Sequence, residues 1–275
     1  MSNNTDTRWL DAIRPCYFPD AAMSAIVSAA FLFWKGTAIR WSLALVALAA
    51  IFLLQIAGSV WDKYYSGKDK DLRTIALALC ATGLVLGARL ISQTGSAMFW
   101  LILAGALLAL CYPWVKNNVA GDVAVLLGCG FIPGTGMSLA ATGAIDWSVL
   151  TTALPVGLVT CAILHAGITG KIPTEERADI SSKLSLGSKA AAYLYWCEMI
   201  VPYIIIGVLS MAYILPVWTV FIFLTFPVAI GCARAMVKSI TGGTEMIADL
   251  RSRSANLQLM FSTMLALSLL IAGLA

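Results

Sequence analysis

The most regular feature of the sequence is a series of long apolar runs separated by short polar connections. Each run is about 20 residues long, the length that an α-helix needs to cross the hydrocarbon core of a bilayer. Because backbone polar groups in lipid must be satisfied within the segment, such runs are predicted to be helices. The nine predicted spans cover residues 17–34, 41–61, 73–92, 96–114, 122–142, 147–168, 189–209, 212–231 and 255–274. The seventh and eighth spans are nearly contiguous, which predicts a tight helical hairpin.

Composition supports the same fold class. Of the 275 residues, 60% are hydrophobic and 12% are charged, whereas soluble domains carry about 25% charged residues. No strand pattern or soluble segment interrupts the spans. We therefore expect one all-α integral membrane domain over residues 1–275. Its expected partners are membrane lipids and a lipophilic small molecule, with no nucleic acid, and its oligomeric state is left open.

Charged residues are distributed unevenly along the chain. Fifteen of the 18 Lys and Arg residues fall at the N-terminus or in the connections 2–3, 4–5, 6–7 and 8–9, leaving Lys35, Arg40 and Arg89 on the opposite side. The positive-inside rule then predicts a multi-pass protein of the cell membrane with a cytoplasmic N-terminus and an external C-terminus. Asp20 and Asp122 open the first and fifth spans, where a negative charge favours a helix N-terminus.

Two polar stretches follow apolar runs on the expected cytoplasmic side. One is Gln55–Asp71 (QIAGSVWDKYYSGKDKD), and the other is Ile163–Glu176 (ILHAGITGKIPTEE), which contains the only histidine. In the second stretch, Lys171 and Glu175 are four residues apart, so they share one face of a helix. Because four spans separate the stretches, we expect two halves of a bundle that meet around a shared cavity.

The order of these stretches resembles the UbiA superfamily of intramembrane prenyltransferases, and within it the dihydroxynaphthoate (menaquinone-type) branch. The similarity extends over essentially the whole chain. It is carried by the two polar stretches together with Trp9–Ala21 (WLDAIRPCYFPDA), Val115–Phe131, Asp146–Leu164 and Lys183–Ala191. The resemblance implies a UbiA-type bundle of nine transmembrane helices with two acidic-motif positions on the cytoplasmic side.

The motifs themselves depart from the family pattern. Members typically carry N-x-x-N-D-x-x-D and D-x-x-x-D, whose carboxylates hold the Mg²⁺ ions that grip a prenyl diphosphate. The corresponding positions here are Ser59, Asp62, Lys63 and Ser66, then Lys171 and Glu175. Of the four expected aspartates, only the Glu175 position keeps a carboxylate, and ammonium groups repel a metal ion. We therefore expect no metal or cofactor in this site, with Mg²⁺ retained only for a divergent prenyltransferase.

These positions supply the candidate site residues. Lysines can stabilise an anionic oxygen, an imidazole can move a proton near neutral pH, and an ionisable residue inside a span is a functional candidate. The candidate catalytic residues are Lys63, His165, Lys171, Glu175 and Glu198, and the candidate substrate-binding residues are Gln55, Asp62, Ser66, Lys116 and Tyr64. The first set, with Asp62, is expected around the cytoplasmic mouth of the bundle, apart from Glu198, which falls well inside the 189–209 span.

A structural interpretation of the same residues stays open. Ion pairs Asp62–Lys171 and Lys63–Glu175 could replace the metal bridge between the two halves. Glu198 could be a partnered glutamate that faces another helix.

Three functions follow from the sequence. The leading hypothesis is a UbiA-fold enzyme repurposed for metal-independent chemistry on a lipophilic substrate, most simply a cyclisation or isomerisation in natural-product or lipid biosynthesis. The alternative is a divergent prenyltransferase that moves a prenyl group from a prenyl diphosphate to an aromatic or lipid acceptor. In this second case, lysines including Lys116 bind the diphosphate directly. A third possibility is a non-catalytic lipid-binding homologue.

Overall fold

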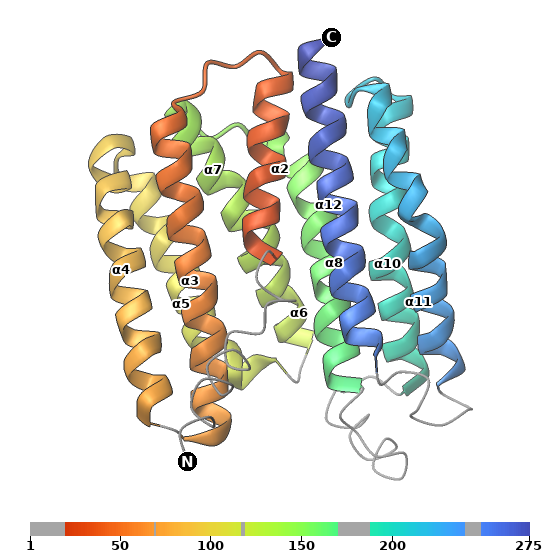
Figure 1. Ribbon diagram of the computed structural model, residues 1–275, viewed down its shortest axis with the longest axis horizontal. Helices are drawn as coiled ribbons and strands as arrows, with labels where there is room; N and C mark the ends of the chain where they lie inside the picture. The colour runs from red at the N-terminus through yellow and green to blue at the C-terminus, as the bar shows by residue number, and fades with distance from the viewer. Residues whose placement is uncertain (1–19, 69, 117–118, 170–187, 240–248) are drawn as a thin grey trace, which may run out of the picture.

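The computed structural model describes residues 20–68, 70–116, 119–169, 188–239 and 249–275, and over these ranges the chain is helical without strands. Eight of the described helical segments are long and apolar enough to cross a membrane, and the shorter apolar helix Asp20–Trp34 lies among them. The all-α, multi-pass prediction is confirmed (Figure 1).

The helices follow the predicted spans closely. The first four are α2 (Asp20–Trp34), α3 (Trp41–Gly67), α4 (Lys70–Thr94) and α5 (Ser96–Val115). The fifth span is α6 (Val119–Leu126), a π-helical turn η2 (Leu127–Phe131) and α7 (Ile132–Thr142). The remaining spans are η3 (Trp147–Val149) with α8 (Leu150–Thr169), α10 (Ser188–Met211), η4 (Val217–Thr225) with α11 (Phe226–Lys238), and α12 (Leu250–Leu274).

The second and eighth spans differ most from the prediction, and α12 begins at Leu250, five residues before the predicted start at residue 255. Helix α3 continues to Gly67, six residues past the predicted end, because polar residues end an apolar run without breaking a helix; it stops where Lys68 adopts a left-handed φ of 52°. The eighth span runs from Val217 to Lys238 instead of over residues 212–231, since residues 212–216 form the turn of the α10–η4 hairpin. Pro216 is extended there and precedes nine residues of 3₁₀-helix. The predicted hairpin is present.

The bundle is centred on α2, α8 and α12. Helix α12 packs against α2 and α8, while α10 packs against α8 and α11, and α3 packs against α4. Figure 1 shows α3, α4 and α5 on one side of this centre and α10 and α11 on the other. The largest buried side chains include Tyr195 and Tyr203, and their hydroxyls bond to those of Ser254 (2.8 Å) and Thr225 (2.7 Å). Each buried hydroxyl thereby finds a partner inside the apolar core.

The fifth span approaches α8 closely through two glycines. A Cβ added at Gly157 of α8 would lie 2.9 Å from Cα of Gly130 in η2, and backbone atoms there cannot move aside easily. In the π-helical turn, the carbonyl of Cys129 accepts a hydrogen bond from the hydroxyl of Ser24 on α2. This contact fixes the turn between α2 and α8, so that Gly128 and Cys129 form part of a cavity wall.

The helix ends group on two sides of the bundle. The ends of α3, α5, α8 and α11 lie at the same end as the starts of α4, α6, α10 and α12 (Figure 1). The described parts of both polar stretches therefore share one end, as predicted. Which membrane face this end occupies stays a prediction.

At the opposite end, Asp146 precedes η3 and accepts hydrogen bonds from the Lys35 ammonium group (2.7 Å) and from the backbone (3.0 Å) and side chain (2.5 Å) of Ser148. Burial acts to raise the pKa of Asp146, but these bonds and the lysine charge outweigh it, so the pKa lies below its ordinary value. The ion pair ties α2 to the start of the sixth span.

Candidate functional site

A cavity of about 820 Å³ opens between the two sides of the bundle, toward the end that carries the polar stretches. Its walls come from α2, α3, α5, the η2 span, α8 and α12. Most of the wall is apolar, with Ile51, Leu54, Leu108, Ile132, Ile163 and Leu164 among the lining residues. A cavity of this size and polarity suits a lipophilic ligand.

One face of α3 supplies the first-motif positions to this cavity. Gln55, Ser59, Asp62 and Ser66 all line it and follow helical spacing, so they share one stripe of the helix. Lys63 lines the cavity as well. The hydroxyl of Ser59 donates to the carbonyl of Gln55, and the hydroxyl of Ser66 donates to that of Asp62, each at 3.0 Å. Both hydroxyl protons are thus used within α3.

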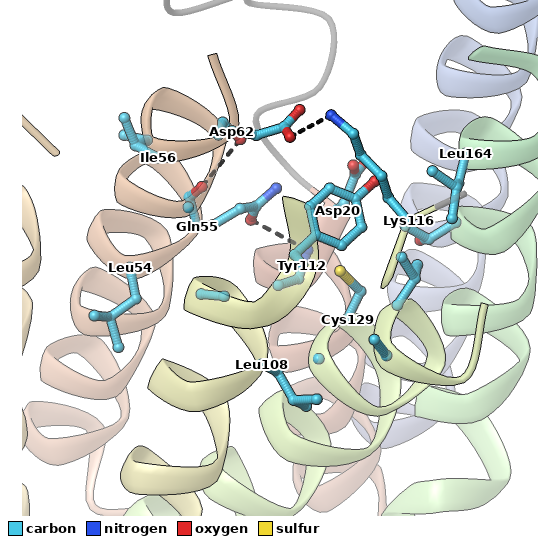
Figure 2. A pocket seen from close by; sticks show the side chains of 18 of the residues that line it. Asp20, Leu54, Gln55, Ile56, Asp62, Leu108, Tyr112, Lys116, Cys129 and Leu164 are labelled. Atoms are coloured by element: carbon cyan, nitrogen blue, oxygen red, sulfur yellow. Dashed lines mark hydrogen bonds and ion pairs between the residues drawn. The ribbon is translucent and has the colours of Figure 1, made fainter. Parts of the chain in front are cut away.

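Asp62 forms an ion pair with Lys116 at the end of α5, and Figure 2 shows this pair bridging the cavity. Among the described residues, the lysine that pairs with Asp62 is the one that follows the last turn of α5, and the Asp62–Lys171 pair stays a prediction. Lys171 and Glu175 lie outside the described residues, so a Lys63–Glu175 pair stays a prediction. Among the described first-motif positions, the single carboxylate is already matched by a lysine.

Gln55 caps the start of helix α2, a role that the sequence did not predict. Its amide oxygen accepts hydrogen bonds from the backbone N–H groups of Ala21 (3.2 Å) and Ala22 (3.4 Å), which belong to the first turn of α2. These N–H groups have no partner within the helix, so the glutamine side chain caps α2 from α3. The cap holds Asp20 at the cavity wall, near Tyr112 in Figure 2.

Sequence reasoning missed several polar residues of the cavity, including Asp20, Tyr112 and Arg251. Arg251 begins α12 and lies against Gly167 of α8, where an added Cβ would come within 2.9 Å of its Cδ and 3.0 Å of its Nε. The absence of a side chain at Gly167 therefore makes room for the arginine. The Arg251 charge also acts on Asp20, whose buried Oδ1 makes no hydrogen bond with the described residues. The sequence feature that could have indicated Arg251 is its position in the first turn of the last apolar helix.

Tyr64 is not among the residues that line the cavity, and its part in substrate binding stays a prediction. It follows Lys63 on α3, and because successive residues of a helix point in different directions, its side chain lies away from the face that lines the cavity. Its ring lies 5.2 Å from that of Trp61. The next residue, Tyr65, accepts a hydrogen bond of 2.7 Å from the indole of Trp114, which joins α3 to α5 near the mouth.

His165 also points away from the cavity mouth, where it was expected. Its neighbour Leu164 faces the cavity, whereas the His165 ring is 3% exposed and turns toward α10 and α6. Nδ1 lies 2.7 Å from Oε2 of Glu198, and Nε2 lies 3.4 Å from Oδ2 of Asp122. Glu198 is thus a partnered glutamate facing another helix, which was the structural interpretation. Whether either residue takes part in catalysis stays a prediction.

Comparisons with known proteins agree with this architecture. A model of the UbiA prenyltransferase family matches residues 68–252. A 1,4-dihydroxy-2-naphthoate octaprenyltransferase of Mycobacterium tuberculosis is 27% identical over 270 residues, covering 89% of this chain and 90% of that protein. A UbiA prenyltransferase domain-containing protein 1 homolog of Drosophila melanogaster is 27% identical over 249 residues, which cover 80% of this chain and 69% of that protein.

A solved structure from a study of digeranylgeranylglyceryl phosphate synthase has a similar fold. It superposes with a TM-score of 0.54 at 14% identity and covers 97% of this chain and 98% of that one.

Proposed function

Because the chain belongs to the UbiA prenyltransferase family, we propose that it transfers a prenyl group from a prenyl diphosphate to a lipophilic aromatic or lipid acceptor. In this reaction the bond between the prenyl C1 and the diphosphate oxygen breaks, and the diphosphate leaves with the electron pair. A new bond forms between C1 and the acceptor, which loses a proton. This was the alternative to the metal-independent conversion in the sequence hypotheses, and family membership favours it.

The observation that carries the proposal is the distribution of charge in the cavity. Lys63, Lys116 and Arg251 line the cavity together with a long apolar wall. A prenyl diphosphate has the matching form, with an apolar chain and a multiply charged anionic head. Cations placed beside the leaving group offset the negative charge that develops on it, so they would favour ionisation as well as binding.

The described donor set does not fit the pair of Mg²⁺ ions that the family pattern implies. Such ions need several free carboxylate oxygens. The first motif offers Asp62, which is paired with Lys116, and two serines whose hydroxyls bond to their own helix. In our proposal, therefore, the side-chain cations hold the diphosphate and Asp62 orients Lys116. Asp20, whose Oδ1 makes no hydrogen bond with the described residues, is the carboxylate available to accept the proton from the acceptor.

The test is a pyrophosphate-release assay on the purified protein in lipid nanodiscs. Prenyl diphosphates of several chain lengths are supplied with dihydroxynaphthoate-type and lipid acceptors, with and without Mg²⁺. We expect release that persists without added Mg²⁺ and falls at least tenfold in Arg251→Ala. Arg89→Ala, which removes an exposed arginine of α4 that does not line the cavity, is the matched control and should retain full activity. Absence of pyrophosphate with every chain length and acceptor would overturn the proposal.

A second function is favoured by one observation, the replacement of motif carboxylates by Lys63 and Ser66 on the cavity wall. A cavity that restricts the conformation of a polyene and polarises one group could catalyse a metal-independent cyclisation or isomerisation. The same assay separates the two functions, because an isomerised or cyclised product would form without pyrophosphate.

A further inference from the structure

Behind the cavity wall, three ionisable side chains from three helices meet in the protein interior. Asp122 comes from the first turn of α6, His165 from the last turns of α8, and Glu198 from the middle of α10. One potential ligand atom from each lies within 4.8 Å of the others. None of the three lines the cavity, so this cluster is separate from the proposed prenyl-transfer site.

The charges of this cluster do not balance. Each carboxylate has an ion-pair distance to His165, and neither has a second cationic partner among the residues that the structure describes. Even with a charged imidazolium, two carboxylates leave one net negative charge in a low-dielectric interior, which is costly. In addition, Oδ2 of Asp122 is buried and makes no hydrogen bond with the described part of the chain, since its approach to Nε2 has an ion-pair distance without hydrogen-bond geometry. With both carboxylates ionised, the described part of the cluster lacks one positive charge if the imidazole is charged and two if it is neutral.

The distances fit a metal ion at this point. Two ligands of a tetrahedral ion with bonds of about 2.0–2.1 Å lie about 3.3–3.4 Å apart, and Nε2 of His165 lies 3.4 Å from Oδ2 of Asp122. The other ring nitrogen, Nδ1, is 2.7 Å from Oε2 of Glu198 and donates to it when Nε2 is the ligand atom. A metal-bound histidine commonly donates its second N–H to a carboxylate in this manner.

We propose that Asp122 and His165 bind a divalent first-row transition ion such as Zn²⁺, with Glu198 orienting the imidazole. A mixed imidazole and carboxylate set suits these ions better than Mg²⁺ or Ca²⁺, which prefer oxygen ligands alone. A divalent charge with a neutral imidazole also makes the cluster neutral. The ion joins α6 to α8, and through Glu198 to α10. It replaces none of the cations proposed to hold the diphosphate.

The test uses Co²⁺, a coloured substitute for Zn²⁺, on full-length protein that has been treated with chelator in detergent. We expect visible absorption that saturates at about one Co²⁺ per chain and is displaced by Zn²⁺. Asp122→Asn and His165→Gln should each weaken Co²⁺ binding at least 100-fold, and Glu198→Gln about 10- to 100-fold, as expected for an outer carboxylate. Asp62→Asn, which changes a cavity carboxylate instead, should leave binding unchanged.

Two results would overturn the metal site. The first is wild-type protein that binds neither Co²⁺ nor Zn²⁺ above the level of the detergent blank, a measurement that does not depend on whether any variant folds. The second is a monodisperse His165→Gln variant that binds Co²⁺ as tightly as the wild type. Both are independent of prenyl transfer, because binding is measured without substrate.

Discussion

Two glycines on α8 allow the cationic end of the cavity to be tested separately from the stability of the bundle. Gly167→Ala places a Cβ 2.9 Å from Cδ and 3.0 Å from Nε of Arg251, whereas carbon atoms in contact normally lie about 3.5–4.0 Å apart. The arginine must therefore retreat by roughly 0.6–1 Å. Its side chain is flexible, so the strain should be small, and alanine gains about 0.5–1 kcal/mol over glycine within a helix.

The expected result is a loss of ligand recognition without a loss of stability. If Arg251 holds the diphosphate, a shift of this size should weaken pyrophosphate binding and raise KM for the prenyl diphosphate about tenfold, equivalent to about 1.4 kcal/mol. The rate of the chemical step can fall further, since a misplacement of about 1 Å can cost 100-fold in rate. The assays are calorimetric binding of inorganic pyrophosphate and steady-state pyrophosphate release. Melting in detergent should stay within a few degrees of wild type.

Gly157→Ala is the matched control, because its Cβ would meet the backbone of Gly130 at 2.9 Å instead of a flexible side chain. Overpacking of this kind costs about 1–3 kcal/mol, so this variant should melt earlier while its folded fraction still binds pyrophosphate. Unchanged pyrophosphate affinity in Gly167→Ala would refute the role of Arg251. Equal destabilisation by the two substitutions would refute the argument that a flexible side chain moves aside for the added Cβ whereas the backbone does not.

Three further predictions concern other polar contacts. Lys116→Met should lower kcat/KM at least tenfold whereas Asp62→Asn should change it only a few-fold; a complete loss in Asp62→Asn, with activity restored by excess Mg²⁺, would instead indicate a metal ligand. Because the pKa of Asp146 is lowered in the folded state, its ion pair contributes stability above the unfolded value of 3.8, and this is lost as pH falls through the folded pKa. Melting curves between pH 6 and 3 should show a smaller acid-dependent decrease in Asp146→Asn than in wild type. Tyr203→Phe removes a buried hydroxyl bond and leaves its partner hydroxyl without that bond, so we expect a cost of about 1–3 kcal/mol in unfolding measurements; a neutral variant would contradict this.

The sequence predicted what depends on local patterns. Apolar runs located the spans because hydropathy and helix length are properties of contiguous residues. The family resemblance identified Ser59, Asp62 and Ser66 as motif positions, and the structure directs these residues, which share one stripe of α3, into the cavity.

Tertiary contacts were outside the reach of the same reasoning. Arg251 reaches the cavity only because α12 packs beside α8 at Gly167, and the two residues are far apart in sequence. His165 was expected at the cytoplasmic mouth, but the structure directs its ring to Glu198. The sequence did contain a feature that could have indicated this pair. Spans six and seven are consecutive and antiparallel, and they carry His165 and Glu198 within their helices.

The 3₁₀ segment η4 has a consequence for the membrane itself. A 3₁₀-helix rises about 2.0 Å per residue against about 1.5 Å in an α-helix, so nine residues extend about 4.5 Å further. Its side chains also align every third residue, and the buried Thr219, Ile222 and Thr225 follow that interval. They form a straight ridge against the bundle, which an α-helix would turn into a spiral. With 22 residues, the η4–α11 span can therefore match a bilayer several ångströms thicker than an all-α helix of the same length, without altering its tilt.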